Sequence, residues 1–218
     1  MARYSVADWP LTVAAKDVDR AGRGRPGSPA PRLLDVRSPS AWEEWLEENH
    51  ETVQEGVWLR LFRKGDSSST LDYSQAVDVA LCFGWIDGQA KKYDAVSRVQ
   101  RFTPRRSRSM WSKVNTERAE HLSKAGRLRP AGQRAVEDAK RTGRWEQAYD
   151  PPSKASIPED FLAELAKNEK AAAFFATLNK RNTYSVAYRL QTARSPETRA
   201  RRIKTFVEMF ERGEKLYG

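Results

Sequence analysis

The sequence predicts an α+β protein, with a small, mostly antiparallel sheet and packed helices followed by an all-helical C-terminal unit. Three observations lead to this prediction. Apolar residues alternate along GVWLRLFRK (56–64), which is typical of a strand. The segments 85–91 and 97–102 flank a polar turn at 92–95, as in a β-hairpin. After residue 156 the apolar residues recur three and four apart, which is typical of amphipathic helices.

The first predicted helix starts at Ser40, whose hydroxyl would cap it. Trp42, Trp45 and Leu46 lie three and four apart and form its apolar face, while its other face is acidic. The strand 56–64 should be nearly buried on both faces. The next predicted element is a helix over residues 74–83, which ends at Gly84.

From Ser112 onward the pattern is helical. Asn115 is a plausible cap of one helix, and Pro130 suits the first position of the next. The segment PPSKAS (151–156) marks an inner boundary. We therefore expect three parts: a flexible extension over residues 1–36, an α+β domain over 37–150 and a helical domain over 151–218.

Composition narrows the function classes. The 218 residues include 39 Lys+Arg and 29 Asp+Glu, a formal charge of +10, which favours anionic partners. Cys82 is the only cysteine and His50 and His121 are the only histidines, so an internal disulfide, a thiolate cluster and a histidine-rich metal site are excluded. We expect no cofactor or metal. The sequence shows no apolar run of membrane-spanning length and no secretion signal, which makes a cytoplasmic location the expectation.

Several blocks resemble a known bacterial family. They are ALCFGWIDGQ (80–89), QRFTPRRSRSMWSKVN (100–115) and AGRLRPAGQRAVEDAKRTGRW (125–145), together with the helical stretches after residue 156. The chain resembles YdeI/OmpD-associated, or bacteriocin-protection, proteins over roughly residues 38–213. This resemblance implies a stress or antimicrobial-peptide tolerance role, and it brings no catalytic residues.

The stretch from Arg98 to Lys113 contains six cations and no acid. Guanidinium groups beside the free N–H groups of a helix start suit phosphate or carboxylate, and an aromatic side chain can stack on a ligand. The predicted anion-binding residues are Arg98, Arg101, Arg105, Arg106, Arg108, Trp111 and Lys113, with Phe102 as a second stacking candidate. The alternative is that these cations pair with the acidic helix or are solvated.

Asp87 is a weak candidate for a general base, because an Asp-Gly pair is more often a simple turn. The leading expectation is a non-enzymatic tolerance factor that binds an anionic small molecule or an acidic protein. One alternative is a nucleic-acid-binding protein. Another is an enzyme acting on a phosphorylated or carboxylated metabolite, with Asp87 as its base and Arg105 and Arg106 as anchors.

Overall fold

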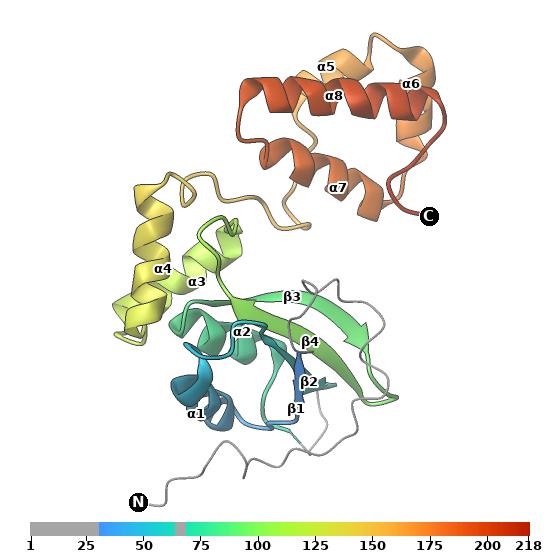
Figure 1. Ribbon diagram of the computed structural model, residues 1–218. Helices are drawn as coiled ribbons and strands as arrows, with labels where there is room; N and C mark the ends of the chain where they lie inside the picture. Colours follow the sequence, from blue (N-terminus) through green and yellow to red (C-terminus); the bar gives the residue numbers. More distant parts are fainter. Residues whose placement is uncertain (1–30, 64–68) are drawn as a thin grey trace, which may run out of the picture. The chain divides into compact units, whose positions relative to one another are not determined.

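The computed structural model describes residues 31–63 and 69–218, which form two compact units (Figure 1). Of the described residues, the first unit contains 31–63, 69–109 and 118–139. The second unit contains 110–117 and 140–218. Among the described residues, no helix is both long enough and apolar enough to cross a membrane.

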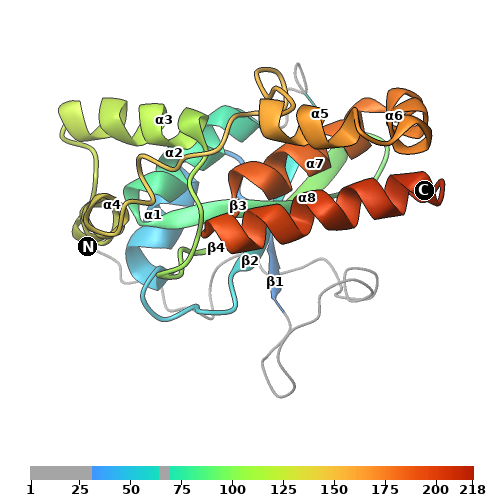
Figure 2. The same cartoon turned by 90° about the horizontal axis from the view of Figure 1, so that it is seen from above.

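The first unit contains a four-stranded sheet in the order β1-β2-β4-β3 (Figure 2). Its strands are β1 (Arg32–Leu34), β2 (Val57–Phe62), β3 (Trp85–Lys92) and β4 (Ser97–Pro104). β1 pairs parallel with β2, whereas β2–β4 and β4–β3 are antiparallel. The sheet is therefore mixed, and the predicted α+β class with a mostly antiparallel sheet is confirmed. The predicted hairpin is confirmed as β3 and β4.

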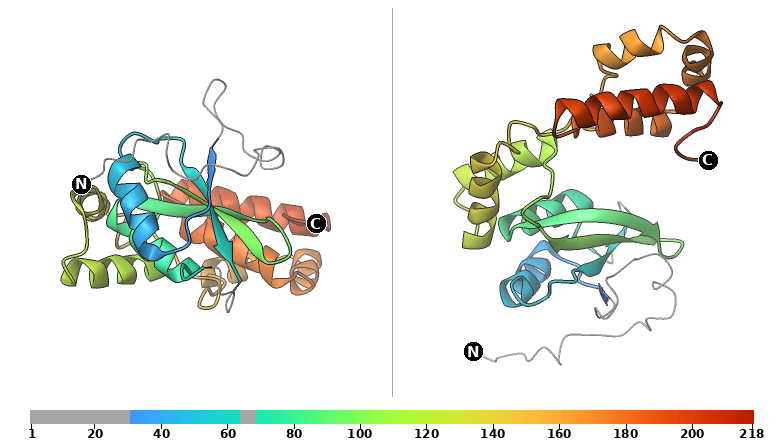
Figure 3. Two further views of the ribbon diagram at one scale, coloured as in Figure 1. Left: turned by 90° about the horizontal axis from the view of Figure 1, so that it is seen from below. Right: turned by 45° about the horizontal axis from the view of Figure 1, so that its top comes forward.

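Two helices, α1 (Pro39–Asn49) and α2 (Tyr73–Cys82), pack on one face of this sheet (Figure 3). Trp42 of α1 is fully buried, with its ring centroid 5.6 Å from that of Phe102 and 6.4 Å from that of Trp85. Its indole N–H donates to the Ala76 carbonyl of α2. These aromatic contacts fix both helices to the same side of β3 and β4, because buried indoles combine a large apolar area with one directed hydrogen bond.

The predicted start of α1 at Ser40 is wrong by two residues. Ser38 is the cap, and its Oγ accepts from the Ala41 N–H at 3.1 Å. Pro39 follows as the first helical residue, where a missing N–H leaves no bond unmade. Helix α2 is capped by Asp72 in a reciprocal arrangement with Gln75.

The helices α3 (Lys113–Lys124) and α4 (Pro130–Arg141) follow the hairpin. Pro130 opens α4 as predicted. Asn115 is not a cap, because α3 already begins at Lys113 and the Asn115 N–H donates to Ser112 Oγ at 3.2 Å.

The second unit is built around four helices, as predicted for the C-terminal part. They are α5 (Glu159–Leu165), α6 (Glu169–Ala176), α7 (Lys180–Gln191) and α8 (Pro196–Glu211). Phe161, Phe206 and Phe210 form the aromatic centre of its core. Leu162 is 45% exposed, because it follows Phe161 directly and turns to another side of the helix.

The predicted domain limits differ from these units. Residues 1–30 of the predicted extension lie outside the described residues. Arg32–Leu34, also assigned to that extension, forms β1, and Leu34 and Val36 are buried. The compact units divide at residues 139 and 140, with 110–117 in the second unit, rather than at 151–156.

Candidate anion-binding cleft

The predicted anion-binding residues come from several elements of both compact units. Arg98 and Arg101 lie on β4, and Arg105, Arg106 and Arg108 follow in the loop after it. Trp111 and Lys113 belong to the second compact unit. The arginine stretch is contiguous in sequence but is divided between the two units, so its members face different surroundings.

Three members of the stretch make contacts that hold the fold. The Arg101 guanidinium donates to the Glu55 carbonyl and lies over the Trp58 ring, and burial lowers its pKa. Trp111 is 2% exposed and its ring lies 5.0 Å from that of Trp145, so it is a packing residue rather than an open stacking surface. The Lys113 ammonium pairs with Asp150 at 2.8 Å. Phe102, the second stacking candidate, is fully buried.

The acidic residues of α1 have partners from a later part of the chain. Arg129 lies 3.3 Å from Glu43 and 3.2 Å from Glu47. Arg134 of α4 lies 3.6 Å from Glu51. Glu43 and Glu47 of α1, and Glu51 just after it, thus pair with cations outside the arginine stretch.

Of the predicted site residues, Arg98 lines a cleft in the first unit. This cleft has a volume of about 770 Å³ and lies between the end of β2, the segment before α2 and the β3–β4 hairpin. Its lining residues are Leu61, Phe62, Arg63, Ser69, Thr70, Leu71, Asp72, Tyr73, Ala90, Lys91, Lys92, Asp94, Ser97 and Arg98. The volume is in the range of sites that hold small organic ligands.

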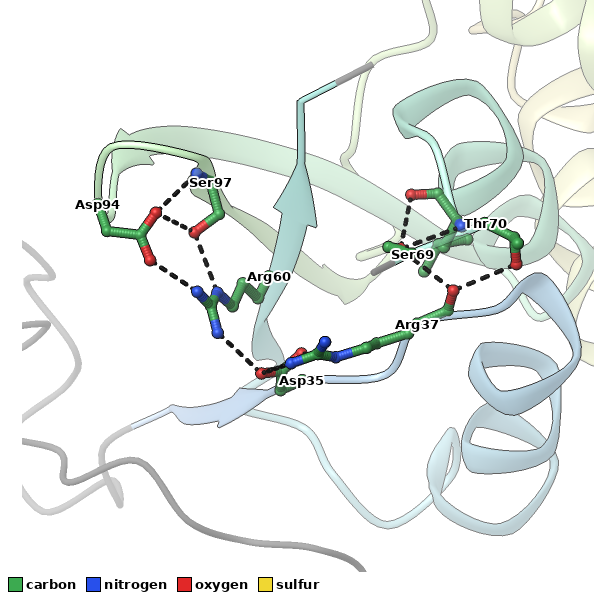
Figure 4. Close-up of polar contacts among 8 residues, drawn as sticks. Asp35, Arg37, Arg60, Ser69, Thr70, Asp94 and Ser97 are labelled. Carbon is green, nitrogen blue, oxygen red and sulfur yellow. Dashed lines mark hydrogen bonds and ion pairs between the residues drawn. The ribbon is translucent and has the colours of Figure 1, made fainter. Parts of the chain in front are cut away.

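One wall of the cleft is held in place by main-chain hydrogen bonds. The Arg37 carbonyl accepts from the N–H groups of Thr70 and Leu71 at 2.8 and 3.1 Å. It also accepts from the Ser69 hydroxyl at 3.1 Å (Figure 4). This anchoring positions the segment 69–71 opposite the hairpin.

The floor of the cleft contains a like-charged pair. Lys92 of β3 lies directly across from Arg98 of β4, and Arg98 lies across from Leu61 of β2. Directly opposed residues in antiparallel strands point to the same face, so these three side chains form one row. Both cations are exposed, and neither forms an ion pair with any residue that the structure describes.

Arg98 also lies beside a hydrogen-bonded Tyr–Asp pair. Its guanidinium carbon is 5.0 Å from the centroid of the Tyr73 ring. The Tyr73 hydroxyl donates to Asp87 at 2.7 Å, and partial burial together with this carboxylate raises the pKa of Tyr73 well above 10. Tyr73 therefore stays protonated at neutral pH and serves as a donor rather than a base.

The cleft has four cationic lining residues and two carboxylates, and both carboxylates are occupied elsewhere. Asp72 accepts from the Gln75 N–H as the cap of α2. Asp94 accepts from the Arg60 guanidinium at 2.6 Å and from Ser97, as Figure 4 shows, and these bonds lower its pKa to about 2. Arg63 is exposed and, within the described part of the chain, forms no ion pair. With Asp94 paired to Arg60, the exposed cations Arg63, Lys92 and Arg98 give the lining an excess of positive charge over Asp72.

Comparison with known families gives two matches. Residues 154–213 match the family described as bacteriocin-protection, YdeI or OmpD-associated. This helical segment is similar to that family. The YdeI/OmpD-associated segment covers α5 to α8, whereas residues 34–135, which include the cleft, match a domain of unknown function, DUF8412. No curated protein and no solved structure matches the chain.

Sequence reasoning found Arg98 but missed Arg63, Lys91 and Lys92. The alternation along β3 could have indicated which of its residues face the cleft. Ala90 and Lys92 lie two residues apart and so share a face of the strand. Among the described residues, no group of three His, Cys, Asp or Glu side chains is placed to hold a metal ion.

Proposed function

We propose that this YdeI/OmpD-associated protein is a non-enzymatic tolerance factor that binds an anionic small molecule in the cleft beside Arg98. The like-charged pair Lys92–Arg98 carries the proposal. Like charges directly opposed across two strands are unfavourable, and an anion between them would remove that repulsion. Arg63 adds further positive charge to the lining.

The tolerance role rests on the family description of residues 154–213. The binding role rests on the cleft in the first unit. A protein of this kind would bind a charged metabolite or an antimicrobial-related anion without transforming it. Asp87 supports this choice over catalysis, because its carboxylate is engaged by Tyr73.

The binding role is tested by calorimetric titration of the full chain with inorganic phosphate and with pyrophosphate at low ionic strength. Removing one charge of a bidentate or paired cation site should weaken binding about ten-fold or more. Arg98→Ala and Lys92→Ala should each show this loss. The matched control is Arg106→Ala, which removes an exposed arginine that does not line the cleft.

Two results would overturn the binding role. One is the absence of any anion binding by the wild-type chain. The other is an equal loss of affinity in the Arg98 and Arg106 variants, which would indicate a diffuse charge effect.

The physiological role is tested in a deletion strain that is complemented with the wild-type protein or with the double variant Arg98→Ala/Lys92→Ala. Survival of the two strains is measured in the presence of an antimicrobial peptide. Equal survival would show that the cleft does not contribute to tolerance.

The net charge of +10 also favours a nucleic-acid ligand, which is tested by the same titration with oligonucleotides. It predicts that the logarithm of the affinity for oligonucleotides falls linearly with the logarithm of the salt concentration, because the protein's cations displace the counterions condensed on the phosphates. It also predicts that Arg106→Ala and Arg98→Ala weaken binding to similar extents, because phosphate contacts would extend over the basic loop.

A further inference from the structure

The cleft combines its cationic pair with an apolar surface. Leu61 lies in the same cross-sheet row as Arg98 and Lys92. Ala90 precedes Lys92 by two residues on β3, which places both on one face of the strand. Leu71, on the opposite wall, is 3% exposed and lines the cleft.

Polar groups are placed on one side of this apolar surface. The two cations of the row lie at the hairpin end of β3 and β4, near the turn that Asp94 and Ser97 close. Ser69 and Thr70 add hydroxyl groups to the facing wall, where both are engaged by the Arg37 carbonyl. A bare inorganic anion would contact the cations but leave Ala90 and the Tyr73 ring, both exposed, in water.

We infer that the cleft is built for an amphipathic anion, a ligand with a phosphate or carboxylate head group and an apolar body. This inference rests on the proposed function and deepens it by naming the ligand class. The head group lies between Lys92 and Arg98. The apolar body lies against Ala90 and the Tyr73 ring, which are exposed apolar groups of the lining. Tyr73, 39% exposed, covers the ligand beside Arg98.

The size of the cleft agrees with a two-part ligand. A volume of about 770 Å³ exceeds what a single oxyanion fills and is typical of sites for organic molecules with a ring or chain. Burying the apolar part of such a ligand adds affinity in proportion to the area removed from water, so a ring system should contribute a factor of about ten or more.

Three probes separate the contributions: naphthyl phosphate carries both parts, inorganic phosphate carries the head group alone and naphthol carries the body alone. Each is titrated into the full chain, with calorimetry as the readout. Naphthyl phosphate should bind about ten-fold tighter than either half. Replacing the phosphate by a carboxylate, in naphthoate, distinguishes the two head groups.

A variant in the apolar lining tests the contribution of the ligand's apolar body independently of the cations. Ala90 is exposed on an edge strand, so Ala90→Phe should fold normally while filling the cleft, because aromatic residues are favoured in strands. It should reduce the affinity for naphthyl phosphate to that for inorganic phosphate and leave inorganic phosphate unchanged. The control is Ala95→Phe, an exposed hairpin position that does not line the cleft.

The outcomes separate this inference from the proposed function. Equal affinities for inorganic and naphthyl phosphate, both sensitive to Arg98→Ala, would overturn the amphipathic ligand and keep the anion site. Equal affinities for naphthol and naphthyl phosphate would show that the head group contributes nothing and would overturn the inference. No binding of either phosphate would overturn both proposals.

Discussion

Asn182 and Tyr217 form a reciprocal pair that holds the C-terminal residues against α7. The Asn182 side-chain amide donates to the Tyr217 carbonyl at 3.2 Å, and its oxygen accepts from the Tyr217 N–H at 3.0 Å. Asn182 is 1% exposed, so its amide has little access to water. The Arg181 guanidinium lies over the Tyr217 ring at 4.3 Å and reinforces this attachment.

The first prediction is that Asn182→Ala destabilises the second unit by about 1–3 kcal/mol, because it breaks the pair and leaves buried main-chain groups without partners. Chemical denaturation measures the loss, and hydrogen exchange at the Tyr217 N–H should become much faster. Lys180→Ala, an exposed position on the same helix, is the control. Unchanged exchange at Tyr217 in the Asn182 variant would contradict the prediction.

The second prediction concerns the contact between α4 and α2. A Cβ at Gly132 would lie 2.3 Å from the Cys82 carbonyl oxygen and 2.9 Å from that of Leu81. Gly→Ala inside a helix is ordinarily stabilising by about 1 kcal/mol. Here the main chain of α2 must move, so Gly132→Ala should instead destabilise by about 1–3 kcal/mol.

Thermal unfolding of the Gly132 variant beside Gln133→Ala, an exposed neighbour on α4, measures this difference. A rise in the melting temperature of the Gly132 variant would show that the two helices do not approach each other this closely.

The third prediction follows from the like-charged pair in the cleft. Arg98→Gln should raise the stability of the ligand-free protein by a few tenths of a kcal/mol, about the size of a cross-strand pair, while it weakens anion binding. The gain should shrink at high salt, since salt screens exposed charges. Lys92→Gln should give the same gain, and the double variant should gain less than the sum, because the two residues share one interaction.

Melting temperatures at low and high salt test this, with Arg106→Gln as the control for loss of net charge alone. An equal, salt-sensitive gain in the Arg106 variant would attribute the effect to the overall charge of +10 instead of the pair.

The same pair shows how far the sequence could predict the site. The hairpin was predicted, but Lys92 was placed in its turn and not at the end of β3, so its position opposite Arg98 was hidden. The register also shifts between Asp87 and Ala90, and an irregularity of this kind leaves no clear mark in the residue pattern. Arg98 was found because a cationic stretch is visible in sequence; its partner was missed because pairing depends on register.

The fold was more predictable than the site for a physical reason. Long segments such as α8 and β2 bury a whole face, and a buried face requires apolar residues at regular spacing. This spacing is visible in the sequence. Strand β1 has only three residues, so it carries too few positions for an alternation to be recognised. Its place in the sheet is decided by pairing with β2, a contact between distant parts of the chain.

The final prediction concerns acid stability of the hairpin turn. Asp94 accepts from the Ser97 hydroxyl and N–H and from the Val96 N–H, and it pairs with Arg60. Its hydrogen bond with the Ser97 side chain is the largest cause of a pKa lowered from 3.8 to about 2. A carboxylate with a depressed pKa stabilises the fold fully above its ordinary pKa, and that contribution is lost as the pH falls toward the folded-state value.

Asp94→Asn should therefore lower the melting temperature at neutral pH, and the difference from wild type should disappear between about pH 4 and pH 2. Thermal unfolding across this range measures the convergence, and Glu44→Gln, an exposed position on α1, provides the control. A difference that stays constant down to pH 2 would mean that the charge on Asp94 does not stabilise the turn.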